Sequence, residues 1–137
     1  MSSYLKLSVR QILSIKPSTP TINPQRGEIW WVNFDPSTGE EIKKTRPAVI
    51  ITAPGMGRSQ LKIVVPIIGW KPHYTKYLWM FKLSPSKTNG LTKESSADAS
   101  QVKSISVQRF GKQIGIVTAD ELDNILAAVA LVIGYNP

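Results

Sequence analysis

Residues Arg26 to Thr52 read RGEIWWVNFDPSTGEEIKKTRPAVIIT, and this stretch sets two apolar, strand-like runs on either side of a polar loop. The first run, Glu28 to Phe34, is rich in Ile, Trp, Val and Phe, side chains that fit a pleated, buried surface. The second run, Ala48 to Thr52, is rich in β-branched residues. The loop between them opens with turn-forming residues and then carries glutamates, lysines and one arginine. Because two core strands would hold this loop still, we expect it to display functional groups.

The rest of the chain predicts further short strands. They are expected at Leu61 to Ile68, Lys76 to Leu83, Ala97 to Ser106 and Gln113 to Val117. In the second of these, Tyr77, Trp79, Phe81 and Leu83 would share one face, with Lys76 and Lys82 on the other, which indicates a strand with one buried face. We expect the third to be short and bent. A set of short strands with turns between them is typical of a small barrel or sandwich.

A helix is expected at the end of the chain. Thr118 to Glu121 has the pattern of a capping box, with acidic residues in the first turn where the helix dipole favours them. Apolar residues at helical spacing follow from Leu122 to Ile133, and Gly134 is a typical stop signal. The fold predicted is therefore mainly β with α, a small half-open barrel closed by this C-terminal helix.

These motifs resemble the MazF/PemK/Kid family of type II toxins. The resemblance rests on RGEIWWVNFDP, on the Gly-x-Glu of Gly39 to Glu41, and on Thr-Arg-Pro-Ala-Val-Ile-Ile. It continues in LKIVVP at residues 61–66, in Gln-Val-Lys-Ser at 101–104 and in Arg109, and it covers roughly residues 26–134. It implies an SH3-like barrel, no cofactor, and the position of catalytic and RNA-contacting residues named below.

The family's activity gives the functional expectation. Its members are endoribonucleases, also called mRNA interferases, that cut single-stranded RNA at selected sequences without a metal. They leave a 2′,3′-cyclic phosphate and a 5′-hydroxyl. By resemblance we expect a cytoplasmic homodimer that is held in check by a cognate MazE-like antitoxin.

The first 25 residues differ from the rest and are expected to form an extension to a toxin domain at 26–137. Tyr4 to Ile15 has the apolar spacing of a short amphipathic helix, and a Pro-rich linker follows it. The family usually begins near Arg26. We therefore expect an extra N-terminal helix that the family lacks.

The charge of the chain points to an anionic partner. Net charge is +8, and all 17 lysines and arginines precede Thr118 together with six of the nine acids, which gives +11 for residues 1–117. The last 20 residues carry three acids and no base. A basic body suits a polyanion such as RNA, whereas the alternative is that the charge serves solubility alone. There is no cysteine, which fits a reducing compartment, and no apolar run long enough to span a membrane.

The candidate catalytic residues are Arg46 and Glu41. The single histidine, His73, excludes a two-histidine cleavage pair within one subunit, and no cluster has the spacing of a metal site. RNA can still be cut through its own 2′-hydroxyl if the protein stabilises the phosphoryl charge and moves protons. The guanidinium of Arg46 suits that charge, and Pro47 restricts the backbone beside it. Alternatively, Arg46 forms a structural salt bridge to a neighbouring glutamate, and Glu41 is only solvated.

Ile68 departs from the family, which usually has a threonine there whose hydroxyl contacts the scissile phosphate. Isoleucine offers no donor, and loss of one such donor costs on the order of 10²–10³ in rate. The alternatives are a slower nuclease, a nuclease with a donor from elsewhere (Ser59, Thr75, His73 or Ser104), or a protein that binds RNA or antitoxin without cutting. A CcdB-like gyrase inhibitor, which shares the barrel, is a further alternative.

Several residues are candidates for gripping RNA. Loop and strand-end cations suit phosphate contacts, and aromatic residues among lysines suit unpaired bases. A tryptophan beside a strand is, alternatively, part of the core. Gln101 is included because it matches a family residue near the RNA. The predicted RNA-binding set is Lys43, Lys44, Arg58, Trp70, Lys71, His73, Gln101 and Lys103.

Overall fold

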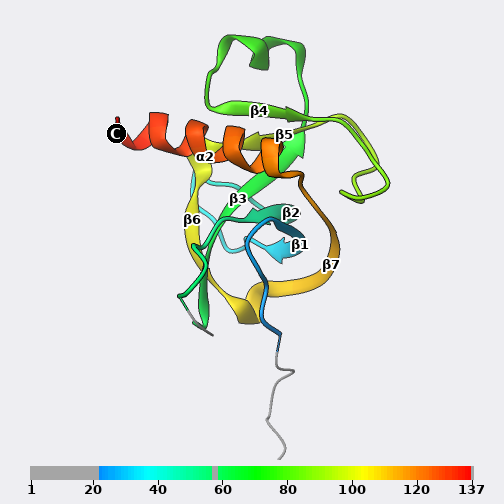
Figure 1. The fold of residues 1–137 in the computed structure, drawn as a ribbon, viewed down its shortest axis with the longest axis vertical. Helices are drawn as coiled ribbons and strands as arrows, with labels where there is room; N and C mark the ends of the chain where they lie inside the picture. The colour runs from blue at the N-terminus through cyan, green and yellow to red at the C-terminus, as the bar shows by residue number, and fades with distance from the viewer. Residues whose placement is uncertain (1–21, 57–58, 137) are drawn as a thin grey trace, which may run out of the picture.

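The computed structural model describes residues 22–56 and 59–136, which form a curled antiparallel sheet with one long helix against it (Figure 1). Three short 3₁₀ helices, η2 to η4, interrupt the connections. The elements in chain order are β1 (Glu28–Asn33), β2 (Thr45–Ile50), β3 (Leu61–Gly69), η2 (Pro72–Lys76), β4 (Met80–Leu83), β5 (Ser95–Asp98), η3 (Ala99–Gln101), β6 (Lys103–Ser106), η4 (Val107–Arg109), β7 (Phe110–Ile116) and α2 (Ala119–Ile133).

The long strand β3 organises the sheet. The strand order is β4-β5-β3-β2-β1-β7, and β6 pairs with β3 off this path. The first half of β3 pairs with β6 through Leu61↔Ser106, and the last residues pair with β5 through Ile67↔Ala97. The sheet therefore splits along β3 and curls without closing, which agrees with the predicted half-open barrel.

Two apolar clusters lie on the two faces of the sheet. One joins Ile29, Val49 and Ile67 to Ile125 of α2. The other lies inside the curl and includes Val32 and Ile50. The division follows from strand geometry, because neighbouring residues of a strand point to opposite faces.

The helix α2 forms as the sequence predicts. The Thr118 side chain accepts from the Glu121 N–H, and the Glu121 carboxylate accepts from the Thr118 N–H. These bonds satisfy two of the N–H groups that a helix start leaves unpaired. Gly134 ends the helix in the left-handed conformation, with φ of 72°.

Three expectations need correction or fall outside the structure. The predicted strand at 76–83 is wrong for its first residues, because η2 extends to Lys76 and a turn from Tyr77 to Met80 delays β4. The bent strand expected at 97–106 is two strands, β5 and β6, separated by η3, where the Asp98 carboxylate accepts from the Ser100 N–H. The helix expected at 4–15 lies outside the described residues.

Candidate active site

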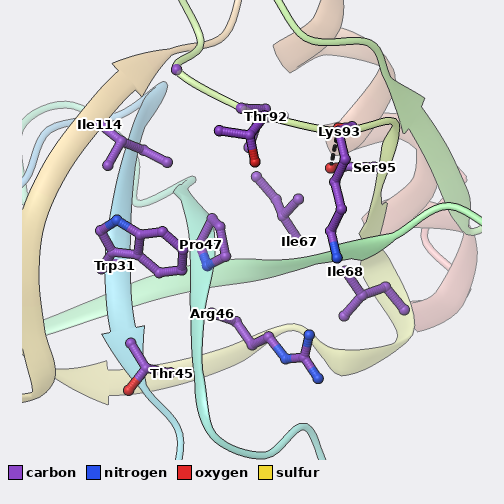
Figure 2. Close-up of a pocket in the computed structure, with 12 residues that line it drawn as sticks. Trp31, Thr45, Arg46, Pro47, Ile67, Ile68, Thr92, Lys93, Ser95 and Ile114 are labelled. Atoms are coloured by element: carbon purple, nitrogen blue, oxygen red, sulfur yellow. Dashed lines mark hydrogen bonds between the residues drawn. The ribbon is translucent and has the colours of Figure 1, made fainter.

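Arg46 lies inside β2, opposite Val32 of β1, rather than in the loop before the strand. Pairing between β2 and β3 ends at Ala48↔Pro66. Continuing the same register by two residues brings Arg46 opposite Ile68, and Figure 2 shows both side chains on the same side of β3. The arginine therefore stands across from the position where the family has its threonine.

Part of the Arg46 guanidinium is buried and unpaired within the described part of the chain. Its Nε is buried and has no hydrogen-bond partner among the described residues. Among the described residues, Arg46 forms no salt bridge with Glu40 or Glu41, and Glu41 Oε1 accepts from the Thr38 N–H at 2.9 Å. A buried N–H without a partner is costly, so an arginine left in this state is a candidate for binding an anion.

A pocket of about 220 Å³ opens where β2 and β3 separate. Its floor is apolar, with Pro47 beside Trp31 (Figure 2). The lining contains two cations and several hydroxyls, but no carboxylate. The lining residues are Trp31, Thr45, Arg46, Pro47, Ile67, Ile68, Gly90, Leu91, Thr92, Lys93, Ser95 and Ile114.

Sequence reasoning missed the residues that supply this pocket's polar groups besides Arg46. Thr45, Thr92, Lys93 and Ser95 line it, whereas Ser59, Thr75, His73 and Ser104 do not. Three of the four missed residues follow β4, in a polar stretch with no periodic pattern. Thr45 could have been found from the sequence, because it directly precedes the predicted catalytic residue Arg46.

The β1–β2 loop, residues 34–44, is tied down by Gln101. The Gln101 side chain donates to the Glu40 carbonyl at 2.9 Å and accepts from the Ile42 N–H at 3.1 Å. Lys44 has a positive φ of 66°, and its N–H donates to Asp35 Oδ1. Gln101 thus positions the loop that carries Glu41, Lys43 and Lys44, all exposed.

The other predicted cations occupy different places. Lys103 begins β6, is half-buried and pairs with Val64. Arg58 lies outside the described residues. The Arg109 guanidinium donates to the carbonyls of Asn33 and Asp35, so this arginine anchors the start of the β1–β2 loop.

An aromatic ladder, defined as Trp70, His73, Tyr74, Tyr77 and Trp79, follows β3. The ring pairs in contact have centroids 4.8 to 6.5 Å apart, and the rings of Tyr77 and Trp79 are stacked at 4.8 Å. The Lys82 Nζ lies 5.2 Å from the centre of the Trp70 ring. The backbone N–H of Trp70 donates to the Glu94 carbonyl at 3.0 Å. The aromatic ladder therefore begins beside the segment that contains Lys93, a residue of the pocket lining.

Metal and membrane motifs are not found in the described part of the chain. Within residues 22–56 and 59–136, no group of three or more His, Cys, Asp or Glu side chains could hold a metal ion. Within the same ranges, no helix combines the length and apolar character that crossing a membrane requires.

Comparison with known proteins identifies a family and a fold for this chain. Residues 25–133 match the family model described as PemK-like, MazF-like toxin of type II toxin-antitoxin system. The endoribonuclease MazF9 of Mycobacterium tuberculosis is 35% identical over 114 residues, covering 78% of this chain and 93% of MazF9.

Solved structures have the same fold. MazF of Deinococcus radiodurans aligns with a TM-score of 0.69 at 22% identity, over 82% of this chain and 98% of that one. A mycobacterial endoribonuclease in complex with its cognate antitoxin aligns with a TM-score of 0.65 at 17% identity, over 83% of this chain and 98% of that one.

Proposed function

This chain belongs to the family of PemK-like, MazF-like toxins of type II toxin-antitoxin systems, and we propose that it is an endoribonuclease that cuts single-stranded RNA at selected sequences without a metal. MazF9, which it covers almost end to end, is named an endoribonuclease. The observation that carries the proposal is the Arg46 Nε, which is buried without a hydrogen-bond partner among the described residues, in an arginine that lines a pocket without carboxylates.

Arg46 binds the scissile phosphate in this proposal. A guanidinium presents a planar fork of donors that matches two phosphate oxygens, and it remains charged at every physiological pH. Phosphate oxygens would also give the buried Nε the acceptor that it lacks among the described residues. The donor is held in place before the reaction, because Arg46 lies within a paired strand. Such pre-organised donors act on charge that develops in the transition state.

The reaction uses the substrate's own nucleophile. The ribose 2′-hydroxyl loses its proton as its oxygen attacks phosphorus, and the bond from phosphorus to the 5′-oxygen breaks. The 5′-oxygen takes up a proton from solvent, so that a 2′,3′-cyclic phosphate and a 5′-hydroxyl result. We assign Glu41 to accept the 2′-hydroxyl proton or to orient Arg46. One of its carboxylate oxygens bonds Thr38, and the other has no hydrogen bond among the described residues.

The aromatic ladder and the neighbouring lysines hold the unpaired bases and the backbone. Trp70 and His73 offer ring faces for stacking, and Lys71 beside them is exposed to phosphates. Lys43 and Lys44 lie in the β1–β2 loop, just before Arg46 in the sequence, and Lys103 lies at the start of β6. All three would contact RNA phosphates. Gln101 acts on RNA through the loop that it anchors.

The proposed partners are a second copy of this chain and an acidic antitoxin. A structural neighbour was solved with its cognate antitoxin. The net charge of +8 suits an acidic polypeptide that competes with RNA for the same surface. We place this system in the cytoplasm, where mRNA is available.

A cleavage assay with end mapping tests the proposal. The purified full chain is incubated with a long mixed-sequence RNA in excess EDTA, and the products are probed for 2′,3′-cyclic phosphate and 5′-hydroxyl ends. We expect cleavage at a restricted set of sequences and its loss in Arg46→Ala. Absence of cleavage at high protein concentration and in any sequence context would refute the proposal and leave RNA or antitoxin binding alone.

A further inference from the structure

A row of side chains crosses four strands on the face of the sheet to which Arg46 points. Ile68 of β3 is paired with Ser96 of β5, and Ser96 is paired with Lys82 of β4. Arg46 stands opposite Ile68 when the register of β2 and β3 is continued. Residues directly opposite each other in antiparallel strands share one face of the sheet. The row therefore carries a cation at each end, Arg46 on β2 and Lys82 on β4.

The other face of β4 and β5 is closed by the helix. Leu83 and Ala97, which follow Lys82 and Ser96 along their strands, belong to the apolar cluster that contains Ile125 of α2. Figure 1 shows α2 beside these two strands. Lys82 is exposed, whereas Leu83 is fully buried. Because neighbouring residues of a strand point to opposite faces, Lys82 lies on the side of β4 away from α2.

The Lys82 ammonium is held by Trp70. This tryptophan lies two residues after Ile68, and its backbone N–H donates to the Glu94 carbonyl at 3.0 Å, which continues the pairing of β3 with β5. The Lys82 Nζ is 5.2 Å from the centre of the Trp70 ring. A cation over an indole ring is attracted by the ring's quadrupole. A long side chain that is already held loses less freedom when it binds a ligand.

The acids on the β5 side of this face are engaged with serines. Asp98 Oδ1 accepts from the Ser100 N–H at 3.0 Å and from the Ser100 hydroxyl at 2.6 Å. Glu94 Oε2 accepts from the Ser84 hydroxyl at 2.8 Å. Within the described part of the chain, neither carboxylate hydrogen-bonds to Lys82. The charge of Lys82 is therefore free to act on an anionic ligand.

The two cations of the row are too far apart to serve one phosphate. Three strand spacings of about 4.8 Å separate them, or about 14 Å along the sheet. The residues between them, Ile68 and Ser96, are neutral, and the buried Ser96 hydroxyl donates to Met80 Sδ at 3.3 Å. A neutral floor with a cation at each end suits a single strand of RNA, whose phosphates repeat along its length.

We propose that Lys82 is an RNA-binding residue that holds a phosphate other than the scissile one, on the same strand that Arg46 engages. This inference rests on the proposed ribonuclease function. The RNA backbone crosses the sheet from β2 over Ile68 and Ser96 to β4, and so runs toward the aromatic ladder. Trp70 keeps the Lys82 ammonium in place. Lys82 forms no covalent bond and transfers no proton in the reaction.

The first test measures RNA binding by fluorescence anisotropy at several salt concentrations, in an Arg46→Ala background. Lys82→Met should weaken binding by about tenfold and lower the slope of log affinity against log salt by about 0.7, the value for one phosphate of a single strand. Lys82→Arg should keep the slope. Lys87→Met is the matched control, because it removes one exposed lysine from the connection between β4 and β5, and it should change affinity less than twofold. Thermal unfolding establishes that each variant is folded.

A second test identifies the phosphate. Single neutral methylphosphonates are placed in turn around the mapped cleavage site of a short RNA. One of these substitutions should weaken binding when Lys82 is present and have no further effect in Lys82→Met, because the two changes remove the same contact. Equal salt slopes for Lys82→Met and Lys87→Met, or the same methylphosphonate profile with and without Lys82, would overturn the assignment and leave the ribonuclease function intact. A wild type that does not cut RNA refutes the function itself.

Discussion

Replacing Arg46 by methionine should make the protein more stable and abolish its activity. Methionine keeps most of the aliphatic stem of arginine and removes the Nε–H that is buried without a partner. Leaving such a group unsatisfied costs about 1–3 kcal/mol, and Arg46 is only half-buried, so we expect a gain of about 1 kcal/mol in the free energy of unfolding. For a chain of this size that corresponds to a rise of about 3–5 °C in Tm.

The assay is equilibrium unfolding followed by tryptophan fluorescence at fixed protein concentration, together with RNA cleavage by the same preparations. Arg109→Met is the matched control, because the Arg109 guanidinium donates to two loop carbonyls. Removing those charge-assisted bonds should lower stability by about 1–2 kcal/mol. The two substitutions should therefore move stability in opposite directions. If Arg46→Met lowers stability as much as Arg109→Met does, Arg46 serves the fold, and the argument for a functional arginine fails.

Three further outcomes are expected. Trp70→Ala should weaken the binding of single-stranded RNA by about tenfold, because one stacking ring is lost. The measurement is fluorescence anisotropy in an Arg46→Ala background, and the control is Leu78→Ala, an exposed position where binding should change less than twofold. Equal effects of the two substitutions would contradict the role of the aromatic ladder. Gly90→Ala should lower the free energy of unfolding by more than about 2 kcal/mol, because its Cβ would lie 2.0 Å from the Ile114 carbonyl oxygen and its φ is +68°; a neutral result in urea denaturation would contradict that packing. Thr118→Ala should cost about 1 kcal/mol by removing the helix cap, and Thr118→Ser, measured by the same denaturation, should recover most of it.

The sequence predicted those parts of the fold whose causes are local. The cap at Thr118, the stop at Gly134 and the apolar runs of β1 and β3 each depend on residues close together in the chain. The strand expected at 76–83 was wrong only before Met80, where Tyr77 stacks on Trp79 instead of continuing a pleat. Aromatic residues two apart suit a strand, but they also suit a cluster of their own, and tertiary packing decides.

The site was predicted only where a motif carried it. Arg46 and the missing hydroxyl at Ile68 were evident from the resemblance, and the continued register of β2 and β3 brings the two positions opposite each other. Lys93 could not be placed, because its position depends on how a long connection folds back onto Gly69. Gln101 was expected to face RNA directly, and the structure gives its side chain two backbone partners in the β1–β2 loop.

The two hydrogen bonds of the Gln101 side chain, to Glu40 and Ile42, divide the β1–β2 loop into an anchored part and a tip that tolerates substitution differently. Residues beyond the anchor points, from Pro36 to Thr38, form no strand. We expect substitutions there to leave the Arg46 backbone undisturbed, because β1 holds it independently. We therefore predict that substitutions at the loop tip can change the choice of RNA target while the proposed cleavage chemistry at Arg46 stays the same.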